Sequence, residues 1–191
     1  MITTLRAKAL ELGASGAEAI EPASIPVQDE IIKLCEPPRC EGYGKSVNCP
    51  PHAMKPAEAR RWIRTFWGAV LFKIDTSPEI LLSEERIEVF RRIYDMASRL
   101  EAFARDRGYR HAKGLAAGSC KAVFCKGLPC QALEEGGICR FPEVARPSME
   151  ALGINVFKVV EKAGWEIHHM GRDSNPKEVP SAMLAGMVLV E

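Results

Sequence analysis

Two segments of the chain each carry three cysteines with the same spacing, and thiolates are strong ligands for soft metal ions and iron-sulfur clusters. The first segment is CEPPRCEGYGKSVNC at 35–49, and the second is CKGLPCQALEEGGIC at 125–139. Both follow the pattern C-x4-C-x8-C, and each later cysteine lies 90 residues after its counterpart. The candidate metal and cofactor ligands are the seven cysteines of the chain, Cys35, Cys40, Cys49, Cys120, Cys125, Cys130 and Cys139.

The spacing of the cysteines favours iron-sulfur clusters over a zinc site. Structural zinc is most often held by C-x2-C knuckles, and the chain contains no such pair. Iron-sulfur ligands lie on longer irregular loops, where C-x4-C spacing occurs. A disulfide framework is disfavoured because an odd number of cysteines cannot pair fully and the expected compartment is reducing. We therefore expect one or two [4Fe-4S] clusters, with zinc as the alternative cofactor.

Two [4Fe-4S] clusters contain eight iron atoms, so seven thiolates leave one iron without a cysteine ligand. In one arrangement the four later cysteines close one cluster and the first three hold another; in the other, each triad holds one cluster and Cys120 caps one of them. An open iron is a Lewis acid that can bind water, substrate or a side chain. His52 is a candidate ligand and either His168 or His169 a candidate proton donor, although ordinary structural roles are favoured for all three.

The residues around the cysteines are compatible with a negatively charged cluster. Basic residues lie close to the cysteines in the sequence, and glycines would let backbone N–H groups turn towards sulfide. Surface loops are commonly rich in such residues, so this composition is compatible with both interpretations. The basic residues are Arg39, Lys45, Lys121, Lys126 and Arg140, and the glycines are Gly42, Gly44, Gly118, Gly127, Gly136 and Gly137.

Composition and motifs exclude several classes of function. With 26 Lys and Arg against 25 Asp and Glu, the chain has no basic block for nucleic acid, and no apolar run reaches bilayer length. The N-terminus does not resemble a signal peptide, so we expect a soluble, cytoplasmic protein. Motifs of serine hydrolases, zincins, P-loop proteins and dinucleotide-binding proteins are absent from the sequence. The catalytic residues, if the protein is an enzyme, remain unknown.

Helices and strands are predicted to alternate, which favours an α/β fold with helices packed on a mixed sheet. The longest helix is expected to begin at a Ser83 cap and to end at Gly108. We expect a single cysteine-rich metal-binding domain over 1–191, and the repeat allows two similar half-units, 1–78 and 79–191, each with a cysteine loop followed by helix and strand. Helices are predicted at 4–13, 29–34, 56–66, 83–108 and 147–164, and strands at 17–20, 67–75, 111–120, 165–169 and 183–190.

Three stretches of the chain resemble an uncharacterised prokaryotic family of cysteine-rich predicted metal-binding proteins. They are CEGYGKSVNCPPH at 40–52, AGSC at 117–120 and CRFPEVARPSMEALGINV at 139–156, and the likeness extends from about Glu18 to the C-terminus. The resemblance implies metal binding by the seven cysteines, but it implies no particular reaction.

The leading hypothesis is an iron-sulfur protein for electron transfer or redox chemistry, exchanging electrons with a redox partner protein. One alternative is an enzyme that binds a small-molecule substrate at an open iron, in a desulfuration or dehydration type of reaction. Another is a structural zinc-binding or metal-carrier protein. Neither nucleic acid nor a membrane is expected as a partner.

Overall fold

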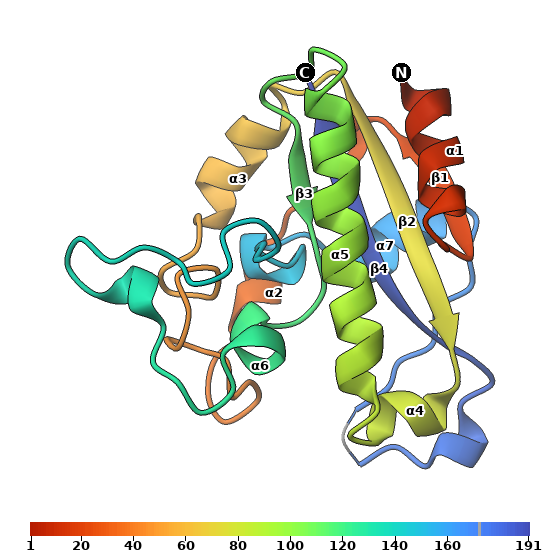
Figure 1. Ribbon diagram of the computed structural model, residues 1–191. Coiled ribbons are helices and arrows are strands. Elements are labelled where there is room, and N and C mark those ends of the chain that lie inside the picture. Colours follow the sequence, from red (N-terminus) through yellow and green to blue (C-terminus); the bar gives the residue numbers. More distant parts are fainter. Residues whose placement is uncertain (172) are drawn as a thin grey trace.

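The centre of the protein is a four-stranded sheet, seen in a computed structural model that describes residues 1–171 and 173–191 (Figure 1). Its strand order is β1-β2-β4-β3. The two long strands, β2 and β4, pair along their whole length, and the shorter β1 and β3 form the edges. The strands span Gly16–Ile20 (β1), Gly68–Thr76 (β2), Lys113–Leu115 (β3) and Ala182–Val190 (β4).

All three strand pairings are antiparallel, so the layered α/β architecture is confirmed but the sheet is not mixed. Because β2 and β3 both pair antiparallel with β4, they run in the same direction. The connection between them contains the long helix α5, as is usual between parallel strands. They are nevertheless not neighbours, because β4, from the end of the chain, lies between them.

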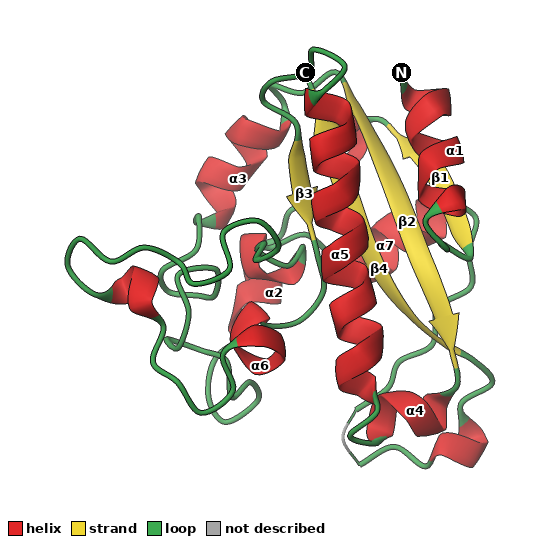
Figure 2. Cartoon of the chain, viewed as in Figure 1, coloured by secondary structure: helices red, strands yellow, loops and turns green. Residues whose placement is uncertain are grey.

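The central strands are buried on both faces, because successive side chains enter two different hydrophobic cores. Val70 and Phe72 of β2 enter one core, whereas Ala69 and Leu71 enter the other. Helices α1 and α5 cover the first face, and α3 and α7 contribute to the second core (Figure 2). The helices span Ile2–Glu11 (α1), Asp29–Lys33 (α2), Pro56–Ile63 (α3), Pro78–Leu82 (α4), Arg86–Arg105 (α5), Cys120–Phe124 (α6) and Val156–Lys162 (α7), with 3-10 turns at Pro22–Ser24 (η1), Gln131–Leu133 (η2), Glu150–Leu152 (η3) and Pro176–Glu178 (η4).

The long helix is confirmed, but its start differs from the expectation. Ser83 closes the separate helix α4, since its backbone N–H donates to the carbonyl of Ile80 at 3.1 Å. The Ser83 hydroxyl also accepts a hydrogen bond from the backbone N–H of Glu85 at 3.1 Å, which precedes the start of α5 at Arg86. Among the described residues, no helix has both the length and the apolar character needed to cross a bilayer.

Three predicted elements near the cysteine segments need correction. Residues 165–169 are irregular instead of forming a strand, although Trp165 and Ile167 pack on the second core. The strand expected at 111–120 covers only Lys113–Leu115, and Cys120 begins helix α6. The helix expected at 147–164 is interrupted by Gly153, whose φ of +81° is a conformation that glycine adopts readily.

The segment from 117 to 147, which contains four of the cysteines, is closed at its base by backbone hydrogen bonds. Ala116 N–H donates to the carbonyl of Pro147 at 2.9 Å, and Met149 N–H donates to the carbonyl of Ala116 at 3.2 Å. A second closure joins Gln28, before the first cysteine loop, to Gly153 through an N–H···O bond of 2.7 Å. Both cysteine loops are therefore fixed to the core where they leave it.

Replacing Gly186 by alanine is expected to destabilise the sheet. Gly186 pairs with Phe72, and a Cβ atom at this position would lie 2.4 Å from the Cζ atom of Phe72. Because the ring is buried and must shift, we expect Gly186→Ala to lower the free energy of unfolding by about 1–3 kcal/mol in urea titrations. Gly171→Ala is the control, because its nearest atom would be Ser174 Oγ at 3.9 Å, and it should change stability by less than about 0.5 kcal/mol. Equal effects of the two substitutions would contradict this packing.

Candidate metal centre

The two cysteine loops lie side by side near β3, although the strands that precede them, β1 and β3, are at opposite edges of the sheet (Figures 1 and 2). In the first loop, Cys35 follows the end of α2 and Cys49 precedes α3. In the second, Cys120 and Cys125 lie at the two ends of α6, and the remaining cysteines follow on irregular chain. The fold therefore places both predicted ligand sets on one side of the molecule.

Hydrogen bonds between the loops form a buried junction at Cys49 and Cys120, which are only 7% and 8% exposed. The Cys120 sulfur lies 3.2 Å from the hydroxyl of Ser46 and 3.5 Å from the side-chain amide of Asn48. The Cys49 sulfur lies 3.4 Å from the hydroxyl of Ser119. Each loop thus supplies a polar group to a cysteine of the other loop. These three partners were missed in the sequence, where their only signal is that they lie within three residues of a cysteine.

Two thiols of the first triad, Cys35 and Cys49, are unfavourable to ionise. The pKa of Cys35 is raised to about 12, mainly by burial and further by the negative charges of Cys40, Glu150 and Cys49. The pKa of Cys49 is also raised by burial, with Cys120 among the neighbours that add to the shift. A metal cation would remove this penalty, because thiolates bind metals in their ionised form.

Cys120 also belongs to the neighbourhood of the second triad. Burial raises its pKa, the hydrogen bonds of the junction lower it, and the charges of Cys139 and Cys130 raise it further. The Cys139 sulfur accepts a hydrogen bond from the backbone N–H of Phe141 at 3.4 Å. Within residues 1–171 and 173–191, however, no group of three or more His, Cys, Asp or Glu side chains is placed to hold a single metal ion.

A cavity of about 850 Å³ opens beside the first triad, and Cys35, Cys40 and Cys49 all line it. Its volume is within the range of about 300–1,000 Å³ found for small-molecule sites. Apolar side chains of α2, α7 and β4 form much of the wall, and Glu150 and His168 add polar groups. A small molecule in this cavity would therefore lie against three thiols, a carboxylate and an imidazole.

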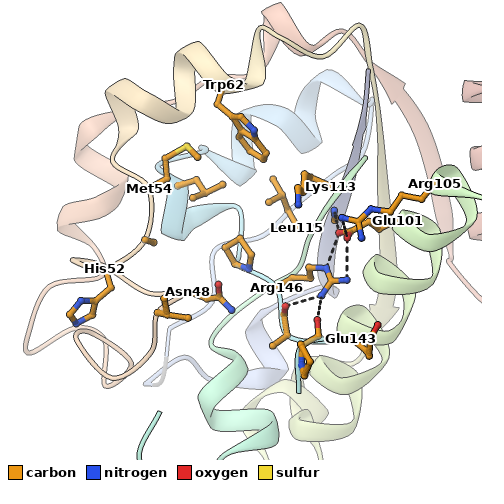
Figure 3. A pocket seen from close by; sticks show the side chains of 17 residues that line it. Asn48, His52, Met54, Trp62, Glu101, Arg105, Lys113, Leu115, Glu143 and Arg146 are labelled. Carbon is orange, nitrogen blue, oxygen red and sulfur yellow. Dashed lines mark hydrogen bonds and ion pairs between the residues drawn. The ribbon is translucent and has the colours of Figure 1, made fainter. Parts of the chain in front are cut away.

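The three histidines singled out in the sequence lie in different places. His168 lines the cavity of the first triad and has its Nε2 atom 3.5 Å from a carboxylate oxygen of Glu166. His169 stacks on Phe157, with ring centroids 4.3 Å apart. His52 lines a separate cavity of about 500 Å³ and is labelled in Figure 3. Of the three, His168 is placed to act next to the first triad.

A buried ion pair in this second cavity anchors the chain that follows Cys139 (Figure 3). Glu101 of α5 is 2% exposed, and its Oε2 atom accepts hydrogen bonds from Arg146 Nε at 2.8 Å and from Gly114 N–H at 2.6 Å. Its Oε1 atom is 2.6 Å from Arg105 Nη2. One carboxylate thus joins the long helix, the edge strand β3 and the end of the second cysteine loop.

Two of the basic residues predicted to accompany a cluster hold the backbone of the second loop. Lys121 Nζ donates to the carbonyl of Cys125 at 3.1 Å, and Arg140 Nη1 donates to the carbonyl of Pro129 at 2.6 Å. These bonds satisfy carbonyl groups that have no partner in regular secondary structure. The two cations therefore order the cysteine loop as well as adding positive charge near its thiols.

Comparison with known families identifies one match that covers most of the chain. The model of the family described as "Predicted metal-binding protein (DUF2284)" matches residues 18–190. Neither the curated proteins nor the solved structures provide a significant match. The match includes both cysteine loops and all four strands except the first two residues of β1.

The raised pKa of Cys35 predicts a distinct pH profile of alkylation in the metal-free protein. The thiolate is the reactive form, so labelling of Cys35 by iodoacetamide should keep rising about tenfold per pH unit to about pH 11. In urea-unfolded chain, where the pKa is about 8.5, labelling should level off by about pH 10. Short labelling pulses followed by peptide mass spectrometry measure both profiles.

Matching plateaus in the two profiles would contradict the shift in the pKa of Cys35.

The same shift has a consequence for stability, because the unfolded thiol ionises first as the pH rises. The Cys35 contribution therefore favours the folded state below about pH 8.5 and is lost progressively as the pH rises towards about 12.

Removing Arg146 is expected to destabilise the protein strongly. Arg146→Met takes a guanidinium away from the buried Glu101 carboxylate, so we expect a loss of about 3 kcal/mol in the free energy of unfolding. Arg99→Met removes an exposed partner that is 3.3 Å from Asp95 and should cost less than about 1 kcal/mol. Urea titrations followed by circular dichroism measure both, and similar losses would show that the Glu101 pair does not anchor the loop.

Proposed function

The chain belongs to this family of predicted metal-binding proteins, and we propose that its metal is iron, bound with sulfide as one or two [4Fe-4S] clusters. Such a cluster supplies one-electron redox chemistry and, where an iron is open, a Lewis acid. The proposed ligands are Cys35, Cys40, Cys49, Cys120, Cys125, Cys130 and Cys139.

The observation that carries the proposal is the contact between the two loops that carry the matched cysteine triads, which lie side by side near β3 (Figures 1 and 2). Cys49 and Cys120 belong to loops that are far apart in sequence, yet hydrogen bonds cross between the loops at both sulfurs. Hydroxyl, amide and backbone N–H groups near thiolate sulfur are among the factors that set the potential of an iron-sulfur centre. The donor set and its surroundings therefore suit a cluster.

The thiols of the two loops influence one another. Cys40 and Cys49 raise the pKa of Cys35, Cys139 and Cys130 raise that of Cys120, and Cys120 and Cys130 also raise that of Cys49. We favour the arrangement in which Cys120 serves the second set, because it lies five residues before Cys125, and the first triad holds a cluster with three cysteines.

Exposed apolar side chains around the second loop support electron exchange with a partner protein. Ile138 is 74% exposed, and three other large apolar residues of the same loop are also exposed. Exposed apolar groups of this kind commonly mark surfaces that meet a partner. A redox protein docked there would lie close to the cysteines of the second set. The four residues are Leu128, Leu133, Ile138 and Phe141.

Anaerobic metal analysis tests the proposal directly. Protein prepared without oxygen should contain about four or about eight iron atoms and an equal amount of acid-labile sulfide, and it should give a paramagnetic resonance signal on reduction. Cys130→Ser should lower the iron content and the thermal stability, because the loop loses a ligand that orders it. Ser24→Ala, in the turn after β1, is the control and should leave both unchanged.

A colourless protein with stoichiometric zinc and no sulfide would overturn the iron-sulfur proposal. A structural zinc-binding or metal-carrier role would then describe the chain better.

The cavity favours a second candidate function, an enzyme that binds its substrate at the first cluster. The three thiols of the first triad, the Glu150 carboxylate and His168 all line one space of about 850 Å³. A small molecule with a sulfur or oxygen donor would bind an iron there while its apolar part packs on the wall. Desulfuration and dehydration are reactions of this type.

Adding a small thiol such as 2-mercaptoethanol tests the second candidate. If substrate reaches the first cluster through the cavity, the thiol should shift the resonance spectrum of the reduced protein. Leu34→Trp places a larger side chain at the cavity wall and should weaken thiol binding by about tenfold, whereas Leu10→Trp, on the exposed surface of α1, should not. A spectrum that does not respond to the thiol would argue for electron transfer alone.

A further inference from the structure

Glu150 lines the cavity of the first triad, and its Oε2 atom is buried without a hydrogen-bond partner among the described residues. Within the part of the chain that the structure describes, its Oε2 atom is shielded from solvent and meets no hydrogen-bond donor. Burial raises the pKa of Glu150, while hydrogen bonds from its own backbone N–H and from Ser148 lower it. A buried oxygen left unpaired is unfavourable, and such atoms mark places where a cation or another ligand completes the structure.

The position of Glu150 in the fold brings it to the first triad. Glu150 begins the 3-10 turn η3, which packs against α2, and α2 ends two residues before Cys35. The Glu150 charge acts on the Cys35 thiol together with those of Cys40 and Cys49. Its position in the sequence does not indicate this neighbourhood, because Glu150 lies outside both C-x4-C-x8-C segments and is far in sequence from Cys35.

The arginine that lines the cavity, Arg86, already has other partners. Arg86 lies 3.6 Å from the carboxylate of Glu84 and donates to the carbonyl of Ser83 at 2.8 Å. The imidazole of His168 is likewise next to the carboxylate of Glu166. Both of these side chains therefore have other partners. A metal ion bound by the cysteines could supply the positive charge that the Glu150 oxygen lacks.

We propose that Glu150 Oε2 is the non-cysteine ligand of the metal centre held by Cys35, Cys40 and Cys49. The inference rests on the proposed metal-binding role of this triad, but it applies to iron and to zinc alike. Three thiolates and one carboxylate provide four donors, and because the described residues of the chain do not hold three of them at the distances of a single ion, binding would draw them together. The oxygen is the hardest donor of the four, so it is the weakest ligand to a soft thiolate-bound centre. The metal position that faces the cavity is therefore the one that exchanges with an incoming thiol, hydroxyl or carboxylate compound.

Loss of the unique iron measures this ligand in the intact protein. Ferricyanide takes one electron from a [4Fe-4S] cluster as one Fe²⁺ leaves, and the remaining three-iron cluster has its own resonance signal. Glu150→Cys supplies a stronger donor and should slow the loss about tenfold, whereas Glu150→Gln should accelerate it about tenfold. Glu143→Gln is the matched control, because Glu143 lines the other cavity, and it should behave as the wild type.

Equal rates of iron loss in the wild type and both Glu150 variants would overturn the inference. If Glu150→Gln does not fold by circular dichroism, Glu150→Cys is read alone against the control. If the wild type holds zinc without sulfide, the iron-sulfur proposal fails, but the ligand is still tested by competition with a chelator. Glu150→Gln should then weaken zinc binding about 10–100-fold and Glu143→Gln should not. Unchanged zinc affinity in Glu150→Gln would overturn the inference.

Discussion

The contact between the two cysteine loops is the interaction on which the site depends. Ser46 is fully buried and lies at hydrogen-bonding distance from the sulfur of Cys120, a residue 74 positions away. Without this contact the two triads would be separate loops that leave the sheet at opposite edges. Because a buried hydroxyl needs a partner, the thiol and the serine fix one another in place. The core supplies a rigid base, and this junction holds Cys49 and Cys120, one from each loop, close to the other loop.

Much of the fold could be predicted because its central elements carry strong local patterns. The apolar runs of β2 and β4 are continuous, since both faces of these strands are covered. The apolar side chains along one side of α5 face the sheet. The place of β4 between β2 and β3 could not be predicted, because no local pattern encodes which strand is inserted. Apolar and polar residues alternate over 165–169 as they would in a strand, but this segment is irregular, and its apolar residues pack on the second core.

The sequence indicates the candidate ligands but not their surroundings. The spacing of the cysteines indicates two triads, and the sequence shows that Cys120 is the spare thiol. It does not show that Cys120 lies between the triads, because this depends on hydrogen bonds across the loops. From the sequence, His52, three residues after Cys49, is a candidate for the extra ligand, although an ordinary loop role is favoured. In the fold His52 lines another cavity, and Glu150 lines the cavity of the first triad.

The backbone closure at Ala116 and Pro147 has a further consequence for how the protein can vary. The residues between them leave the core and return to it at one point. The closing hydrogen bonds and the Glu101 ion pair fix this point to the sheet. Lengthening a loop that is closed at its base costs little chain entropy, because the cost grows only slowly with length. The part of the segment beyond α6 can therefore change its length and cysteine spacing while the sheet stays as it is, whereas Ala117, Cys120 and Val123 belong to the first core and are constrained by it.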